Sequence, residues 1–169
     1  MTSRACISLD TSAPCDRASH AHRTPATRSH SETSSRSVYA AGVELIHTCY
    51  RITDPERSVA FYEALGFEKR RELSIRDEAV NYFLGIPGHE QPELELTYNF
   101  ETPEGGGYDV GTGYGHIALT VDDLDETLAA LAEKGIEPER PPYTVREGGA
   151  RICFVRDPDS YRVELIEAR

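Results

Sequence analysis

The chain has 169 residues, of which 38% are hydrophobic and 28% charged, and its formal net charge at pH 7 is −11. This composition is typical of a soluble globular protein with one domain or two small modules, and no apolar run is long enough to span a membrane. The acidic charge argues against nucleic acid or an anionic membrane as a partner. We therefore expect a cytoplasmic protein whose four cysteines, which lack metal-type spacing, are reduced thiols.

Residues 1–42 differ from the rest of the chain. They are rich in Ser, Thr, Arg and Ala and show neither helical nor strand periodicity. Their five arginines and three acidic residues give a charge of +2, which leaves −13 for residues 43–169. Such a segment cannot bury enough apolar surface to order itself, and it has no apolar stretch of the signal-peptide type. We predict a disordered extension, or a leader that results from a start codon assigned too early.

A strand is predicted from Val43 to about residue 52, because polar and apolar residues alternate there and place His47, Cys49 and Arg51 on one face. Asp54-Pro55 predicts the N-cap and first turn of a helix, and Gly66 its end. The predicted apolar stripe of this helix consists of Val59, Tyr62 and Leu65. Three further strands are predicted at residues 67–73, 79–85 and 94–100, so the first module (about 43–104) reads as βαβββ.

A glycine-rich linker leads into the second module, residues 113–169, which repeats this plan. The predicted elements are a strand at 116–121, a helix at about 123–134, and strands at about 136–139, 151–155 and 162–167. The predicted helix has Asp122 or Asp123 as its cap and a stripe of Leu124, Leu128 and Leu131. The sequence Asp157–Tyr161 predicts a tight turn between the last two strands. The expected fold class is α+β, with two tandem βαβββ modules and curved mixed sheets around a cavity.

The two modules are copies of one another. An offset of 69 positions places His47 on His116, Gly66 on Gly135 and Glu95 on Glu164, without a gap between residues 47 and 95. Repeats of this kind take precedence over local signals in the assignment of a fold. A module of this size cannot cover both faces of its sheet, so we expect copies to pair, within a chain or between chains.

The repeat also identifies a candidate metal site. His47, Glu95, His116 and Glu164 are related by a pseudo-twofold axis, and two imidazoles with two carboxylates suit a divalent metal such as Ni²⁺, Co²⁺, Zn²⁺ or Fe²⁺. Each residue alone would more often be structural, and the symmetric pattern is what favours a site. Arg51 lies on the same strand face as His47; it could contact a small anionic ligand or form an ion pair with a surface acid such as Glu56.

Four stretches match a known pattern: HTCYRITDPERSVAFYEALGFE, ELTYN, GTGYGHIALTVDD and FVRDPDSYRVELIE. Through them the chain from about residue 44 to 169 resembles glyoxalase I, a family of the vicinal oxygen chelate superfamily. The resemblance implies His47, Glu95, His116 and Glu164 as metal ligands, with Ni²⁺ or Co²⁺ favoured over Zn²⁺. It further implies a homodimer in which each site combines the first module of one chain with the second module of the other.

The resemblance also implies the reaction and the remaining contacts. Glyoxalase I isomerises the hemithioacetal of methylglyoxal and glutathione to S-lactoylglutathione through a metal-stabilised enediolate, and Glu164 or Glu95 would transfer the proton. Arg51, Asn99 and Arg146 match positions at the glutathione moiety. Thr112 departs from the pattern, since zinc-type relatives have a basic residue there.

Three other functions of the superfamily remain as alternatives. A methylmalonyl-CoA epimerase would also transfer a proton, but Arg51, Asn99 and the ELTYN motif favour the glyoxalase. An extradiol dioxygenase uses two histidines and one carboxylate on Fe²⁺ and would leave a fourth ligand unexplained. A metal-free, drug-sequestering dimer of the bleomycin-resistance type predicts an apolar groove in place of the four ligands.

Overall fold

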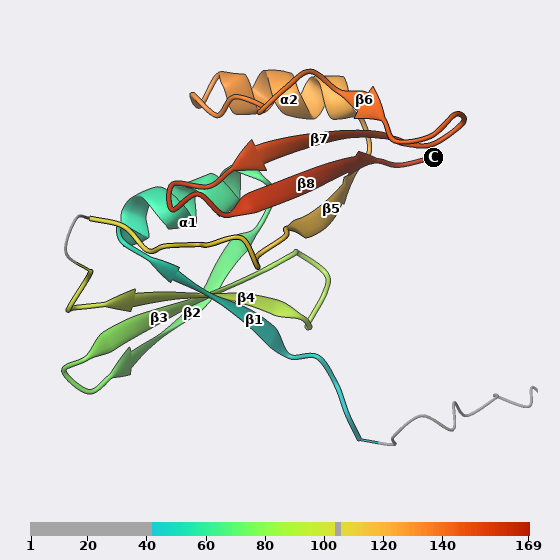
Figure 1. Cartoon of the computed structure of the whole chain (residues 1–169). Helices are drawn as coiled ribbons and strands as arrows, with labels where there is room; N and C mark the ends of the chain where they lie inside the picture. Colours follow the sequence, from blue (N-terminus) through green and yellow to red (C-terminus); the bar gives the residue numbers. More distant parts are fainter. Residues whose placement is uncertain (1–41, 104–105) are drawn as a thin grey trace, which may run out of the picture. The chain divides into compact units, whose positions relative to one another are not determined.

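The computed structural model describes residues 42–103 and 106–169. The extension predicted for residues 1–42 therefore lies, apart from Gly42, outside the described residues. Within residues 42–169 the chain forms two βαβββ modules, as the repeat predicts (Figure 1). In the described part of the chain, no helix combines the length and apolar character needed to cross a membrane.

The first module contains β1 (His47–Ile52), α1 (Pro55–Ala64), β2 (Glu68–Ile75), β3 (Ala79–Gly85) and β4 (Glu93–Asn99). The second contains β5 (Ile117–Val121), α2 (Leu124–Ala132), β6 (Tyr143–Thr144), β7 (Arg151–Arg156) and β8 (Arg162–Glu167). The strand orders are β1-β4-β3-β2 and β5-β8-β7-β6. In each sheet the first strand pairs in parallel with the last and the other pairs are antiparallel, so the sheets are mixed and β1 and β5 are edge strands.

Both helices begin and end where the capping residues predict. The Asp54 side chain accepts a hydrogen bond from the Arg57 backbone N–H at 3.1 Å, and the Asp123 side chain accepts one from Glu126 at 2.9 Å. These bonds satisfy N–H groups that have no partner inside the helix. Gly66 and Gly135 follow the helices with φ of 93° and 76°, a conformation that glycine adopts without a steric cost.

Two predictions about these elements were wrong. Residues 136–139 form no strand, and the second module has the two-residue β6 instead. Prolines at 138, 141 and 142 supply no backbone donor for a ladder, and only the Glu139 N–H reaches β7, at the Phe154 carbonyl 2.8 Å away. The first strand begins at His47 rather than at Val43. The predicted apolar stripe of α1 does face the core, since Tyr62 is buried and Val59 and Leu65 pack against it partly buried, and Ser58 and Phe61 are buried as well.

The burial of Ser58 results from contact between the modules. The tight turn at Asp157–Tyr161, between β7 and β8, places Asp159 against the first module, where its carboxylate accepts hydrogen bonds from the Thr53 N–H at 2.9 Å and the Ser58 hydroxyl at 2.9 Å. The Tyr62 hydroxyl donates to Asp157 at 2.9 Å. Because apolar residues of both modules share one core cluster, these buried polar bonds join two modules that already pack together.

Candidate active site

The first candidate half-site lies on one face of the first sheet. His47 opens β1, and Glu95 lies in the neighbouring strand β4, with Cα opposite Cys49. Alternation along the strands turns both side chains to the same face, where His47 Nε2 lies 3.2 Å from Glu95 Oε2. The Phe83 ring stands edge-on to the imidazole, with centroids 6.2 Å apart. The histidine side chain is 38% exposed, so its nitrogen is open to a ligand.

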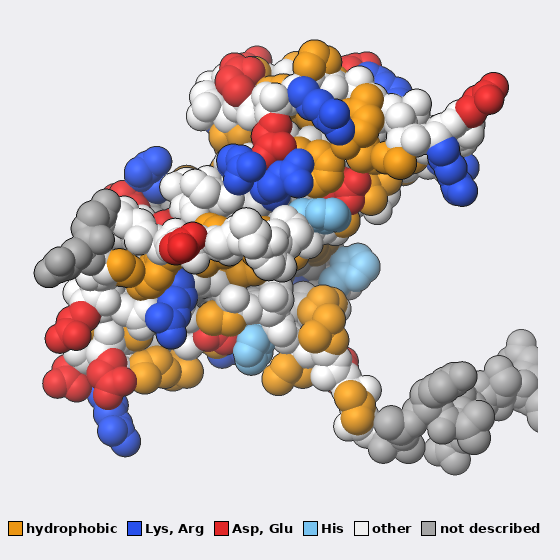
Figure 2. All heavy atoms as spheres, viewed as in Figure 1, with side chains coloured by type: hydrophobic (Ala, Val, Ile, Leu, Met, Phe, Trp, Pro, Cys, Tyr) orange, Lys and Arg blue, Asp and Glu red, His pale blue; other side chains and the backbone are white. Residues whose placement is uncertain are grey.

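The second module repeats this arrangement. His116 directly precedes β5, and its Nε2 lies 3.0 Å from Glu164 Oε2 in β8. Phe154 stands edge-on to His116 with centroids 5.3 Å apart, as Phe83 does to His47. Histidine side chains reach the surface on the face shown in Figure 2, and that of His116 is 39% exposed. The pseudo-symmetry that the sequence predicted is thus present in the geometry of the two pairs.

One chain brings the four residues together as two pairs rather than as a group of four. Among residues 42–103 and 106–169, no group of three or more His, Cys, Asp and Glu side chains is placed to hold a metal ion. In each pair, however, the imidazole nitrogen and the carboxylate oxygen are about as far apart as two ligand atoms bound to the same metal ion. This donor set fits half of the coordination shell of a borderline divalent metal.

The surroundings of the two carboxylates differ. Glu95 Oε1 accepts hydrogen bonds from Asn81 Nδ2 at 2.7 Å and from the Thr97 hydroxyl at 3.2 Å. The residues at the corresponding places around Glu164 are Ile152 and Ile166. The sequence analysis did not identify Asn81, because the register that brings β3 beside Glu95 is a tertiary feature.

A polar cavity of about 770 Å³ lies at the end of the first sheet and contains two of the predicted thiol-contact residues. Arg51 and Asn99 both line it, together with Tyr108, a residue that the sequence analysis also missed. Asn99 Nδ2 donates to the Tyr108 hydroxyl at 3.0 Å, and the Arg51 guanidinium lies 5.9 Å from the centre of the Tyr108 ring. None of the ion pairs between described residues involves Arg51, so the alternative pairing with Glu56 or another surface acid is not formed.

Acidic side chains form much of the remaining wall of this cavity. Asp77, Glu78 and Glu101 line it, and Arg51 is the one cation among its described lining residues. Arg146, the third predicted contact residue, lies exposed in the loop between β6 and β7 and does not line the cavity. Within one chain, therefore, the structure brings Arg51 and Asn99 together but not Arg146.

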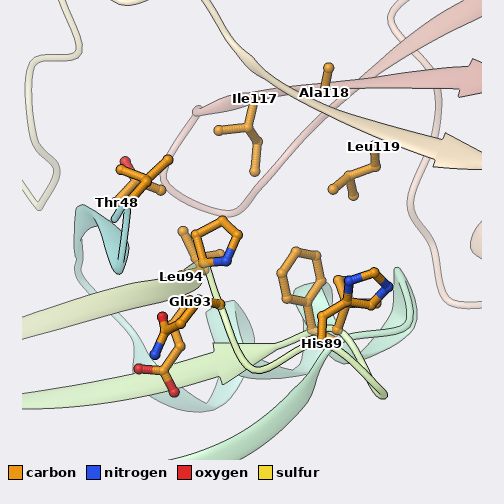
Figure 3. A pocket seen from close by; sticks show the side chains of 12 residues that line it. Thr48, His89, Glu93, Leu94, Ile117, Ala118 and Leu119 are labelled. Carbon is orange, nitrogen blue, oxygen red and sulfur yellow. The ribbon is translucent and has the colours of Figure 1, made fainter. Parts of the chain in front are cut away.

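A second cavity, of about 410 Å³, is mainly apolar and lies between the modules. Figure 3 shows Thr48 and Leu94 of the first sheet on one side and Ile117, Ala118 and Leu119 of β5 on the other. None of the four candidate metal ligands lines it. We therefore assign it no part in the chemistry.

Two cysteines fall within the described residues, and both Cys49 and Cys153 are free thiols. Cys49 lies on the face of β1 that carries His47, and its sulfur is 3.3 Å from the Thr97 hydroxyl oxygen. Burial raises the pKa of the Cys49 thiol, and the nearby Glu95 carboxylate adds to this effect. The thiol is therefore protonated at neutral pH and is a poor nucleophile.

Comparison with protein families places this geometry among known folds. Residues 44–165 match the family model described as the Glyoxalase/Bleomycin resistance protein/Dioxygenase superfamily. The chain belongs to this superfamily. Its two mixed four-stranded sheets are those expected of the glyoxalase I fold, which confirms the resemblance inferred from the sequence.

Individual relatives agree with this placement. A lactoylglutathione lyase of Salmonella typhimurium is 38% identical over 132 residues, which cover 75% of this chain and 94% of that protein. A probable chloroplastic lactoylglutathione lyase of Arabidopsis thaliana is 38% identical over 126 residues, which cover 73% of this chain. This chain spans only 35% of the length of the Arabidopsis protein, and less than half of the length of the other plant relatives that it matches.

Solved structures lead to the same family. The crystal structure of glyoxalase I from Zea mays has a TM-score of 0.66 and 35% identity, and the match covers 73% of this chain and 44% of that one. A trypanothione-dependent glyoxalase I from Leishmania major has a TM-score of 0.60 and 35% identity, with coverage of 74% and 86%. The described residues thus share their fold with enzymes from plants and protozoa.

Proposed function

We propose that the protein is a lactoylglutathione lyase, which isomerises the hemithioacetal of methylglyoxal and glutathione to S-lactoylglutathione. The observation that carries this proposal is the presence of two equivalent His–Glu pairs, one on each sheet, at 3.2 Å and 3.0 Å. The superfamily includes proteins with other functions, but a drug-sequestering protein has no need of four polar ligands in matched positions. The identity with the Salmonella lyase, over nearly its full length, supports the same function.

The proposed metal site combines two chains. His47 and Glu95 of one chain and His116 and Glu164 of a second would provide four ligands to a divalent ion, with Ni²⁺ or Co²⁺ favoured and Zn²⁺ possible. The division of the ligands into two pairs within one chain supports this arrangement, because neither pair alone completes a metal site.

Exposed apolar residues support a homodimer as the assembly. Val43, Leu45 and Ile46, which lead into edge strand β1, are 83%, 69% and 53% exposed. Leu45 also lines the apolar cavity beside β5, the edge strand of the other sheet. Contiguous apolar surface next to unpaired strand edges is typical of an interface. A second copy of the chain would cover it.

The chemistry is a proton transfer between adjacent carbon atoms. When bound, the divalent metal acts as a Lewis acid that stabilises the negative charge developing on the substrate oxygens. Glu164 would take the proton from C1, the carbon that bears the sulfur, while the C1–H electron pair forms a C1–C2 double bond and the C2 carbonyl pair moves onto its oxygen. Glu164 would then return the proton to C2 as the C1 hydroxyl becomes the thioester carbonyl, and the proton of that hydroxyl passes to the C2 oxygen. No atom is lost, and the product is the thioester of lactate.

Glu164 is better able than Glu95 to move to the substrate carbon. Glu95 accepts hydrogen bonds from Asn81 and Thr97, which hold it in place. Glu164 has the His116 imidazole beside it and isoleucines at the places of those two donors. It can therefore turn between the metal and the substrate carbon more easily than Glu95.

Arg51, Asn99 and Tyr108 are proposed to bind the thiol. An arginine with adjacent amide and phenol groups suits a carboxylate of glutathione, and Arg146 of the second module would join them only in the assembled dimer. The acidic wall formed by Asp77, Glu78 and Glu101 favours a second candidate thiol, one that carries positive charge. The Leishmania relative, which is described as trypanothione-dependent, makes trypanothione a suitable comparison thiol.

The test uses chelator-stripped full-length protein, methylglyoxal and glutathione, with thioester formation followed after Ni²⁺, Co²⁺ or Zn²⁺ is added back. We expect strong activation by Ni²⁺ or Co²⁺, and loss of activity in Glu164→Gln even when the metal is added to saturation. The matched control is Glu133→Gln, at an exposed position after α2, which should behave as wild type. Metal binding without activity on glutathione would refute glutathione as the thiol, and activity with trypanothione alone would establish the second candidate.

A further inference from the structure

We propose that Asn81 is a positioning residue for Glu95, which orients this carboxylate for the metal and makes the two symmetry-related carboxylates chemically unequal. The inference rests on the proposed function, because it assigns Glu95 to a metal. It concerns a residue on β3 that is not itself one of the four ligands. Three features of the structure support it: the strand register, the hydrogen bonds of Glu95, and the unpaired oxygen of Asn81.

The register places Asn81 at a position whose equivalent in the second module is apolar. In the first sheet Phe83 is opposite Glu95 and Asn81 is opposite Thr97. In the second sheet Phe154 is opposite Glu164 and Ile152 is opposite Ile166. Asn81 therefore corresponds to Ile152, and the polar pair around Glu95 corresponds to two isoleucines. The modules are alike at the His, Glu and Phe positions and differ at these two.

The two carboxylate oxygens of Glu95 have different partners. Oε2 lies 3.2 Å from His47 Nε2, and these are the two atoms that would hold a shared metal. Oε1 accepts the Asn81 amide at 2.7 Å and the Thr97 hydroxyl at 3.2 Å. A carboxylate that is held through one oxygen presents the other in a single orientation. Such contacts to a ligand that is not yet bound reduce the reorganisation needed when the metal arrives.

The other end of the Asn81 side chain carries a cost to stability. Its Oδ1 is buried and has no hydrogen-bond partner among the described residues. The amide cannot be turned to correct this, because Nδ2 is the group that reaches Glu95. An unpaired buried acceptor destabilises a fold, and an apolar side chain of similar size would avoid that cost, as Ile152 does in the second module.

As a result, we expect the two carboxylates to have different roles. Glu95, fixed by two donors, is suited to remain a ligand. Glu164, which has Ile152 and Ile166 at the positions of those donors, is free to exchange between ligand and base. Asn81 therefore affects the metal only through Glu95. Replacement of Asn81 should act primarily on metal binding.

The test is the variant Asn81→Leu in full-length protein. Co²⁺ affinity is measured by competition with a chelator, the visible absorption spectrum of the Co²⁺-loaded protein is recorded, and thermal unfolding is followed on the metal-free protein. The control is Tyr82→Phe, the next residue on β3, whose side chain projects from the opposite face of the strand. Thr97→Val removes the longer of the two bonds to Glu95 and provides a graded comparison.

For Asn81→Leu we expect Co²⁺ to bind about 10- to 100-fold more weakly and the spectrum to change, while the metal-free protein unfolds at an equal or higher temperature. Thr97→Val should weaken binding less, and Tyr82→Phe should not change the spectrum. Wild-type affinity and spectrum in Asn81→Leu would refute the role of Asn81 while the proposed function stands. A lower unfolding temperature of its metal-free form would show a structural role instead. Failure of the wild-type protein to bind Co²⁺ would refute both proposals.

Discussion

Replacement of Asp157 by asparagine is expected to stabilise the protein at neutral pH and to flatten the dependence of stability on pH. Asp157 is 5% exposed in the turn that joins the modules. Burial raises the pKa of its carboxyl from 3.8 to about 6, and the neighbouring Asp159 carboxylate contributes to the increase. The folded protein therefore binds more protons at this site than the unfolded chain between these two pKa values.

The sign of the effect follows from this difference. Because the folded state binds more protons between about pH 4 and pH 6, the free energy of unfolding falls as the pH rises through that window and is constant above it. A difference of about two pKa units corresponds to at most about 3 kcal/mol. Asparagine does not titrate, so Asp157→Asn does not lose this stability as the pH rises. The difference in free energy of unfolding between Asp157→Asn and wild type should therefore grow by up to that amount between pH 4 and pH 7.

Asparagine can keep the contacts of this turn. Asp157 Oδ1 accepts the N–H groups of Asp159 and Tyr161 at 3.0 Å and 2.8 Å, and an amide oxygen would do the same. The Tyr62 hydroxyl, which now donates to Oδ2, can accept from the amide nitrogen instead. Alanine would leave all three donors without a partner, at a cost of about 1–3 kcal/mol each if they remain buried.

The assay is urea unfolding of the metal-free protein at several pH values between 4 and 8, for wild type, Asp157→Asn and Asp157→Ala. Comparison with wild type at each pH removes the contribution of the other carboxylates. If Asp157→Asn were as destabilised as Asp157→Ala at pH 7.5, the charged carboxylate would be stabilising the turn, and the reasoning from burial would be refuted.

Two further predictions concern the candidate site. If each metal site combines two chains, His47→Ala and Glu164→Gln should each be inactive alone. A refolded 1:1 mixture of the two variants should regain about a quarter of the wild-type activity, because half of the dimers would contain one intact site. A mixture without activity would contradict the shared site. Arg51→Ala should raise KM for the glutathione hemithioacetal at least about 10-fold with little change in kcat, because a hydrogen bond to a charged group is lost in both ground and transition states. Steady-state kinetics with Arg146→Ala as a comparison would measure this effect, and an unchanged KM would remove Arg51 from the thiol site.

The local structure was predictable because local signals determine it. Asp54 and Asp123 predicted the helix starts, since a carboxylate at the N-cap position satisfies free N–H groups of the first turn. The repeat with its offset of 69 predicted the two modules and the equivalence of the His47–Glu95 and His116–Glu164 pairs. Within each pair the residues are 48 positions apart, and parallel pairing of the first and last strands brings them together.

The surroundings of the site depend on contacts that no local pattern encodes. Asn81 reaches Glu95 only through the register of β3 on β4, and the intervening loop differs in length between modules, so the offset of 69 does not apply to β3. Tyr108 comes from the linker, which has no periodicity from which its position could be inferred. Ser58 is buried because a turn 101 residues away docks on it.

The sequence by itself therefore determined the fold class, the duplicated plan and the four candidate metal ligands. It did so because capping, alternation and repetition act over short distances or are copied from one module to the other. The tertiary structure alone decided that one chain holds two separate pairs, that Glu95 is held by Asn81 and Thr97 while Glu164 is not, and that Arg51 faces an acidic cavity wall. These features arise from strand register and module packing, where side chains far apart in the sequence meet.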